Sequence, residues 1–388
     1  MKFIKTILLT TISISMILCS CCGKREAENT AETTEFRANA TVSDSYAYRV
    51  DNERLNIWDL SNNRYDIFCS QPNCKHKTLA DDPNSRCLAV APDKEQEIKY
   101  AFIYENSLYM ICSGNLNETL IYKSDKDGQN RKPYMTVKIS LCSLTNPTFL
   151  NGVLVFVGSE YNTDGKANLQ EHYSICAINL NSKEFENYGE IGKANESLVG
   201  RNSLHICKDR IYFLQCEYTE NSQNNEIKYI DINDTAKSGK TLLASSEPLN
   251  VWQYTDDKII YVVSENGDTH SKVCTLGLDN SKQEQLFERD GYISDVYLSG
   301  EKCFYFFSKT EGENEVRGAA VYDMNSHKTT EYQFAENEWL SVLGHTKNGF
   351  LLYSQKGENE VMELCQDDDF WTLNFENSKK AATGSDVQ

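Results

Sequence analysis

The stretch Leu204-His-Ile-Cys-Lys-Asp-Arg-Ile-Tyr-Phe213 decides the fold of this chain. A short strand-like run ends at the polar turn Lys208-Asp209-Arg210, and a β-branched and aromatic run starting at Ile211 follows it. Alternation over a few residues on both sides of a polar turn predicts two antiparallel strands joined as a hairpin.

This hairpin pattern recurs along the chain. Further copies lie at Ala101–Met110, Thr148–Phe156, Trp252–Val262, Val296–Phe306 and Val342–Tyr353. A third strand that ends on an acidic or amide turn follows most copies, as in Ile230-Asp-Ile-Asn-Asp234, and a fourth run leads into the next unit, as in Thr330-Glu-Tyr-Gln-Phe334. Four strands per unit at a period of about 45 residues are typical of β-propeller blades.

The number of such units is about seven, as expected for one propeller. They lie near 43–70, 97–138, 146–192, 203–245, 250–290, 293–335 and 340–376. The first unit lacks a clear opening strand, which a propeller can supply by pairing the two ends of the chain within one blade. No helix-sized segment separates the strands, so we predict an all-β protein and exclude a parallel βαβ sheet.

The rhythm of strand, Asp/Asn turn and strand resembles the TolB-like propellers of bacterial envelope proteins. The Gly-His and Trp-Asp signals of WD-type repeats do not recur from unit to unit, since each dipeptide occurs once, at Gly344-His345 and at Trp58-Asp59. The resemblance covers nearly the whole mature chain, but it is one of pattern. It therefore implies an architecture and no particular activity.

The first twenty residues have the layout of a signal peptide. Lys2 and Lys5 precede an apolar run at 7–18 that is shorter than the roughly 20 residues a membrane-spanning helix needs. The sequence Leu18-Cys19-Ser20-Cys21 resembles the bacterial lipobox, which implies that Cys21 is acylated and becomes the new N-terminus. The alternative is an ordinary signal peptide that contains cysteines. Lipid on Cys21 would hold the protein at the extracytoplasmic face of the cell membrane.

The remaining boundaries follow from composition. Residues 21–42 are rich in Ala, Glu, Thr and Asn, and they hold few large apolar side chains, so we expect a lipidated flexible linker. The propeller is expected to span 43–378, and residues 379–388 to form a disordered tail.

Charge and motifs exclude several function classes. The formal net charge is −18 at pH 7, so the surface repels nucleic acid, and we expect no nucleic-acid partner. The chain has no His-Glu-x-x-His and no Gly-x-Ser-x-Gly sequence, and thus no local catalytic motif of these hydrolase classes.

Cysteine is frequent, with 14 residues. Seven of them lie inside or beside predicted strands, without paired spacing: Cys112, Cys176, Cys207, Cys216, Cys274, Cys303 and Cys365. Small buried core residues are the expected role for these seven, because a domain of this size needs no disulfide framework.

One cysteine group stands apart, in a loop insertion at 69–87 between the first two units. It reads Cys69-Ser-Gln-Pro-Asn-Cys74-Lys-His76, followed after ten residues by Cys87. Three thiols and one imidazole are a ligand set suited to tetrahedral zinc, and four ligands would make the site structural. The segment resembles a Cys-Pro-Cys-His-Cys loop in uncharacterised lipoproteins of anaerobic Firmicutes. A single disulfide of Cys87 with Cys69 or Cys74, or free thiols, are the alternatives.

Two function classes remain for an anchored propeller of this kind. The first is a non-enzymatic binding or scaffolding lipoprotein that holds an envelope protein, a peptide or a glycan near the membrane. The alternative is an extracytoplasmic carbohydrate-active enzyme whose acids converge at the central channel from separate blades. Two carboxylates about 5–10 Å apart between aromatic walls would favour this alternative.

Overall fold

A computed structural model describes most of the chain as one compact unit. The described residues are 34–37, 40–163, 169–194, 196–219, 222–234, 237–280, 282–312, 314–357 and 359–383. The predicted signal peptide, Cys21 and residues 384–388 lie outside them. None of the helices in the described ranges is long and apolar enough to cross a membrane.

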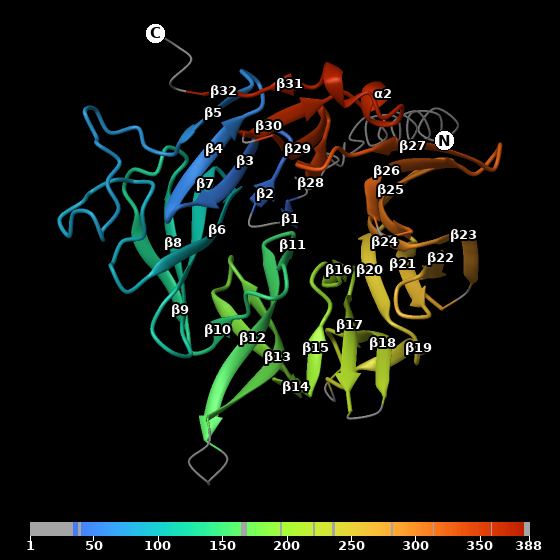
Figure 1. The fold of residues 1–388 in the computed structure, drawn as a ribbon. Helices are drawn as coiled ribbons and strands as arrows, with labels where there is room; N and C mark the ends of the chain where they lie inside the picture. Colours follow the sequence, from blue (N-terminus) through green and yellow to red (C-terminus); the bar gives the residue numbers. More distant parts are fainter. Residues whose placement is uncertain are drawn as a thin grey trace, which may run out of the picture. The chain divides into compact units, whose positions relative to one another are not determined.

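Seven sheets follow one another around a common centre in sequence order, all antiparallel except for one parallel pair in the first, so the all-β propeller prediction is confirmed (Figure 1). Blade 1 contains β1 (Glu35–Arg37), β2 (Ala40–Val42), β3 (Tyr46–Asp51), β4 (Arg54–Asp59), β5 (Arg64–Ile67) and β32 (Ala382–Thr383). Blade 2 contains β6 (Glu97–Tyr104), β7 (Ser107–Ser113), β8 (Thr119–Asp125) and β9 (Lys132–Val137). Blade 3 contains β10 (Ser140–Leu141), β11 (Thr148–Leu150), β12 (Val153–Thr163), β13 (Leu169–Asn179) and β14 (Glu184–Lys193).

The other four blades follow the same order from the inside outward. Blade 4 contains β15 (Ser197–Val199), β16 (His205–Cys207), β17 (Arg210–Tyr218), β18 (Gln223–Asp231) and β19 (Lys240–Ser245). Blade 5 contains β20 (Leu249–Tyr254), β21 (Lys258–Glu265), β22 (His270–Gly277) and β23 (Gln283–Asp290). Blade 6 contains β24 (Tyr292–Ser299), β25 (Lys302–Glu311), β26 (Asn314–Asp323) and β27 (Lys328–Gln333). Blade 7 contains β28 (Glu338–Thr346), β29 (Gly349–Lys356), β30 (Asn359–Cys365) and β31 (Lys379–Lys380), with helix α2 (Asp367–Phe370) and the 3-10 turn η1 (Phe375–Asn377) before β31.

The predicted hairpins are present and their turn residues explain them. Between β11 and β12, Asn151 and Gly152 both have positive φ, at 51° and 83°. A two-residue turn of this kind matches the twist of the strands that it joins, and Asn-Gly is the preferred sequence for it.

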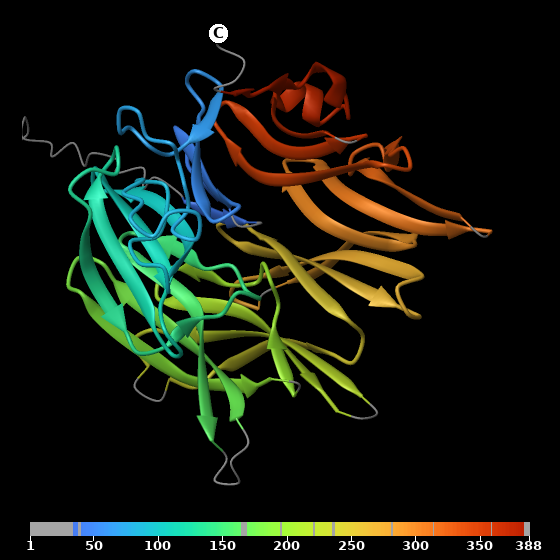
Figure 2. The same cartoon turned by 60° about the vertical axis from the view of Figure 1, so that its left-hand side comes forward.

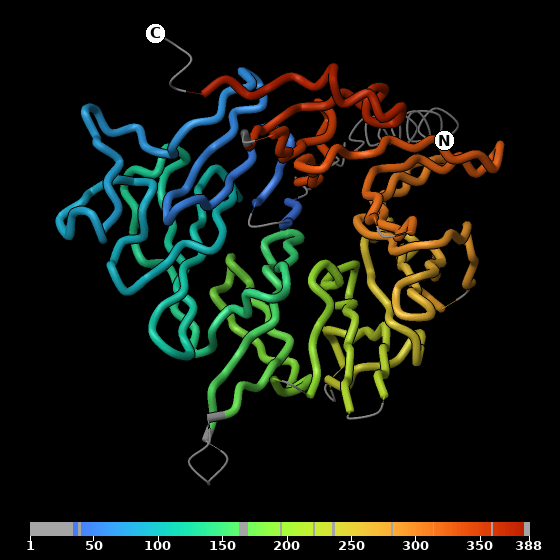
Figure 3. The backbone as a smooth tube through the Cα atoms, viewed as in Figure 1, coloured from blue at the N-terminus to red at the C-terminus, as the bar shows by residue number. Residues whose placement is uncertain are grey.

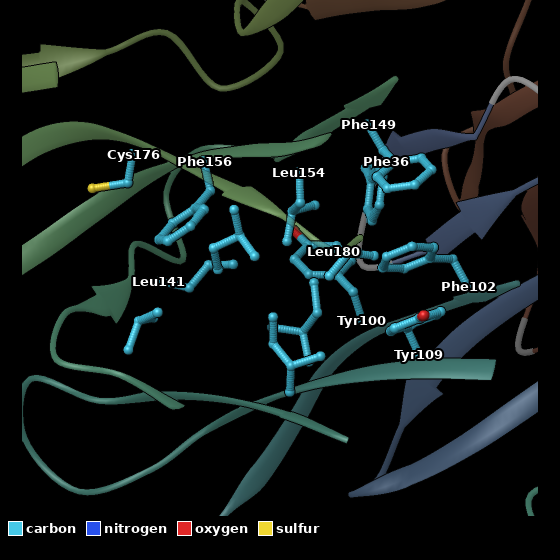
Figure 4. Close-up of a cluster of buried hydrophobic side chains, with 14 of the residues drawn as sticks. Phe36, Tyr100, Phe102, Tyr109, Leu141, Phe149, Leu154, Phe156, Cys176 and Leu180 are labelled. Carbon is cyan, nitrogen blue, oxygen red and sulfur yellow. The ribbon is translucent and has the colours of Figure 1, made fainter. Parts of the chain in front are cut away.

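The core lies between the blades. Each hydrophobic cluster joins two consecutive sheets, and the cluster between blades 2 and 3 shows the pattern (Figure 4). Tyr109 and Ile111 come from blade 2, while Leu154 and Phe156 come from blade 3, and all four side chains are buried. The same kind of cluster joins blade 7 to blade 1, where Trp58 and Leu351 are fully buried. The ring is therefore closed by apolar packing as well as by strand pairing.

Both ends of the propeller differ from the sequence prediction. The prediction of a flexible linker at 21–42 is wrong for residues 35–37 and 40–42, because β1 and β2 are the innermost strands of blade 1. The prediction of a disordered tail at 379–388 is wrong for residues 379–383. There β31 completes blade 7 and β32 pairs in parallel with β5 of blade 1. Figures 2 and 3 show this last segment running beside blade 1.

Candidate metal centre and central cavity

The four sequence-predicted ligands of the loop insertion come together in space. Cys69, Cys74, His76 and Cys87 each offer one ligand atom, and these atoms all lie within 4.8 Å of one another. Cys87 Sγ and His76 Nδ1 are 3.6 Å apart. A tetrahedral zinc ion with Zn–S near 2.3 Å and Zn–N near 2.1 Å would place its ligand atoms about 3.5–3.8 Å apart. The four ligand atoms would therefore form a Cys3His zinc site if the distances between them shortened slightly.

Local backbone geometry produces this convergence. Asn73 and His76 have positive φ, at 59° and 50°, and the N–H of Cys74 donates to the carbonyl of Gln71 at 3.3 Å. These turns fold the short segment back on itself, so that Cys69, Cys74 and His76 share one side of the loop. The N–H of Leu55 donates to the carbonyl of Ala89 at 2.7 Å, which fixes the end of the loop beside β4 and brings in the buried Cys87.

The thiols of the loop differ in acidity. Burial opposes ionisation of Cys69, but the backbone N–H groups of Leu88 and Gln71 stabilise its thiolate, and the net effect lowers its pKa. Burial and the neighbouring Cys69 raise the pKa of Cys87 to about 12. Backbone N–H groups that donate to the Cys69 thiolate would also hold it in the orientation that a metal ligand needs.

The loop packs against blade 2 as well as blade 1. Arg131 Nη1 donates to the carbonyls of Leu88 and Val90 at 3.2 and 2.9 Å. Phe68 packs so closely on the turn at Gly128 that a Cβ there would lie 2.7 Å from its ring. A metal held in this loop would brace the interface between the first two blades.

All eleven cysteines in the described ranges are free thiols, so the structure does not contain the alternative disulfide of Cys87. Those in the strands are buried except Cys207, which is half-buried. This agrees with the predicted role of small core residues.

A second candidate site, which sequence reasoning missed, is a cavity of about 340 Å³ at the centre of the ring. Its walls come from the inner strands of several blades and include Phe149, Trp252, Tyr254 and Tyr297. The strand β1 enters this centre. Thr34 forms a bridge with Phe149, and Phe36 packs edge-on against Tyr100 and Phe102.

The charged groups of the cavity meet at one arginine. Arg37 Nη2 lies 2.6 Å from Asp295 Oδ1, and Arg37 Nη1 lies 3.8 Å from Glu35 Oε1. Arg37 Nη1 also donates to the hydroxyl of Tyr297. Burial alone would lower the pKa of Arg37, but Tyr297, Asp295 and Glu35 outweigh it and raise that pKa. Burial raises the pKa of Glu35 in spite of Arg37.

His205 supplies a neutral group to the same cavity. Its ring stacks on Tyr254, with centroids 4.4 Å apart and planes inclined by 10°. Burial lowers the pKa of His205 to about 4, although Asp256 opposes the shift. The imidazole is therefore uncharged at neutral pH.

The sequence contained a weak sign of this site. Glu35-Phe-Arg37 alternates polar and apolar residues, as a strand does, but three residues are too few for the pattern to stand out from a linker.

No protein-family model matches the sequence, and no curated protein matches it either. Among solved structures, an oligogalacturonate lyase in complex with manganese is 9% identical, with a TM-score of 0.50 over 80% of this chain and 81% of that one. Oligopeptidase B from Leishmania major is 7% identical, with a TM-score of 0.51 over 90% of this chain and 48% of that one. The chain thus spans about half the length of that peptidase. TolB from Acinetobacter baumannii is 12% identical with a TM-score of 0.41, and the fold assignment does not depend on it.

The sheet topology defines the class of protein, a seven-bladed β-propeller, and these likenesses bear on the fold alone.

Proposed function

We propose that this protein is a lipid-anchored binding or scaffolding module at the extracytoplasmic face of the membrane, which holds an envelope protein, a peptide or a glycan. The observation that carries the proposal is the close pairing of Arg37 with Asp295, which leaves Glu35, 3.8 Å from the same guanidinium, as the one loosely held carboxylate of this group. A glycosidase needs a pair of carboxylates, one of them ionised and free to act as nucleophile or base. Asp295 Oδ1 lies 2.6 Å from Arg37 Nη2, so the guanidinium already neutralises the negative charge of Asp295.

The anchor and the binding role are tested together in cells. With an alkyne fatty acid as label and a photo-crosslinker in the medium, the wild-type protein should carry the label and give a reproducible crosslinked product at the membrane. The Cys21→Ser variant should lose the label and leave the membrane fraction. A variant that keeps both would refute the anchor. Hydrolysis of a glycoside by the purified protein, lost in Glu35→Gln, would replace binding by the enzymatic alternative.

We also propose that the loop holds one structural zinc ion. Three thiols and an imidazole of the right spacing support it, and a site with four protein ligands leaves no open position for catalysis. When bound, the ion would neutralise the thiolates and fix the loop against blades 1 and 2.

The metal proposal predicts about one zinc per purified chain by atomic emission, as a Cys3His site implies. Cys74→Ala and His76→Ala should lose the metal and become less stable, because the bound ion stabilises only the folded state. Cys207→Ala, at a half-buried cysteine in blade 4, should keep it. A wild-type protein that is purified without zinc and binds none when zinc is added would contradict the proposal.

A further inference from the structure

We propose that the central cavity binds a small organic cation, with Glu35 as the counter-charge and aromatic rings as the walls. The inference rests on the proposed binding function and names the chemical class of one ligand. Its first support is size. At about 340 Å³, the cavity is at the small end of the range of ligand pockets, so it suits a compact molecule and not a chain.

The second support is the balance of charge. Two carboxylates, Glu35 and Asp295, share the single guanidinium of Arg37, and the shorter contact goes to Asp295. The side chain of Arg37 is only 7% exposed and points away from solvent, whereas that of Glu35 keeps 42% of its surface. Glu35 is therefore the more accessible of the two carboxylates and the one that Arg37 holds less closely. Burial raises its pKa, and a cation bound beside it would favour the charged form. The N–H of His345 donates to its carboxylate, which orients the group without neutralising it.

The mouth of the cavity also carries negatively charged side chains. Asp44 is exposed at its edge, and the exposed His345 is 3.0 Å from Asp367. Acidic groups at the rim of a concave site raise the local concentration of cations. An anionic ligand would meet carboxylates both at the entrance and inside.

The third support is the nature of the walls. Phe149, Trp252, Tyr254 and Tyr297 line the cavity together with Phe36 of β1. An ammonium group over an aromatic face is attracted by the negative face of the ring, and the attraction is stronger when the group is desolvated. The stacked His205 is neutral and does not oppose it.

One hydrogen-bond donor in this wall is unused. Trp252 Nε1 is buried and has no hydrogen-bond partner in the part of the chain that the structure describes. The ring of Trp252 lines the cavity, so the resonance of this N–H reports on a ligand bound there. Choline, a compact quaternary ammonium ion, matches the carboxylate and the aromatic walls.

The test uses choline and its neutral isostere 3,3-dimethylbutan-1-ol as probes of the full chain. With tryptophan labelled by 15N in the indole ring, the resonance of Trp252 is assigned by its loss in Trp252→Phe. Choline should shift this resonance in a saturable manner at millimolar concentration or below, and the isostere should bind at least tenfold more weakly. Glu35→Gln should weaken choline binding at least tenfold, while Glu35→Asp, which keeps the charge, should retain most of it.

The matched control is Glu301→Gln, at an exposed glutamate in the turn before β25, which should bind choline as the wild type does. Unshifted resonances of the other three tryptophans show that each variant is folded. Equal binding of choline and the isostere, no shift with choline, or full affinity in Glu35→Gln would each overturn the inference. Crosslinking to an envelope partner that persists in Glu35→Gln would show that the proposed function stands when this inference fails.

Discussion

Arg37 shows how a single residue can connect distant parts of the ring. It lies on the first strand of the propeller, yet it binds Asp295 and Tyr297 on blade 6. A buried guanidinium is tolerated only when it is paired, so this contact fixes where β1 must lie. The sequence alone does not predict this contact, because Asp295 and Tyr297 lie 258 and 260 positions after Arg37 and belong to no local motif with it.

His205 gives the stability of the protein a dependence on pH. Its pKa is about 4 in the folded protein and near 6.5 in the unfolded chain. Above pH 6.5 both states are neutral, and as the pH falls toward 4 only the unfolded state takes up the proton. Folding should therefore lose about 2 kcal/mol between pH 7.5 and 5 from this group alone.

Urea denaturation at these two pH values measures the loss. His205→Gln should lose about 2 kcal/mol less than the wild type over the same interval. His172→Gln, at a histidine of blade 3 outside the cavity, is the control for replacing a histidine elsewhere in the ring. The same pH dependence in His205→Gln and wild type would show that His205 does not stay neutral in the fold.

At the scale of elements, regular hairpins were predictable and short strands were not. The hairpin of β16 and β17 follows directly from the residues around Lys208, where a positive φ of 53° forms the turn. By contrast, β31 and β32 contain two residues each, and no periodicity can appear over such a length. Their position is set by tertiary contacts, such as Asn63 Nδ2 donating to the carbonyl of Lys380 at 2.8 Å.

Truncation tests what the last strands contribute. A chain that ends at residue 378 lacks β31 and β32, which removes strand pairing from blades 1 and 7 and exposes the edges of both sheets. We expect a loss of roughly 2–4 kcal/mol in the free energy of unfolding, from about three lost backbone hydrogen bonds and the packing of Ala381. A chain that ends at residue 383 keeps both strands and should match the full chain. Equal stability of the two truncations in urea denaturation would contradict a role in closure.

At the scale of the whole molecule, the seven interfaces between blades carry the stability. Leu154 is fully buried between blades 2 and 3, and Leu351 occupies a comparable place between blades 7 and 1. The number and type of blades could be predicted because these apolar runs repeat. The central cavity could not, because its wall is assembled from short segments of several blades that lie far apart in the sequence.

An interface mutation should therefore weaken the entire ring. Leu154→Ala should lower the free energy of unfolding by roughly 3 kcal/mol, because it leaves a cavity in a closely packed cluster. Leu116→Ala, at a leucine that is 63% exposed in blade 2, should change it by less than about 0.5 kcal/mol. Calorimetry should show one transition in both. A separate early transition in Leu154→Ala would mean that the blades unfold independently.

The parallel pairing of β32 with β5 also determines when the protein can finish folding. The strand that joins blade 7 to blade 1 consists of residues 382 and 383, which are synthesised more than 300 residues after β5. While the ribosome is still adding blade 7, the first blade has an open outer edge, and blades 2 to 6 can only stack as an arc. The arc becomes a ring after the last segment emerges, so a ribosome that stalls in blade 7 leaves a nascent chain with two unpaired sheet edges for chaperones and proteases to recognise.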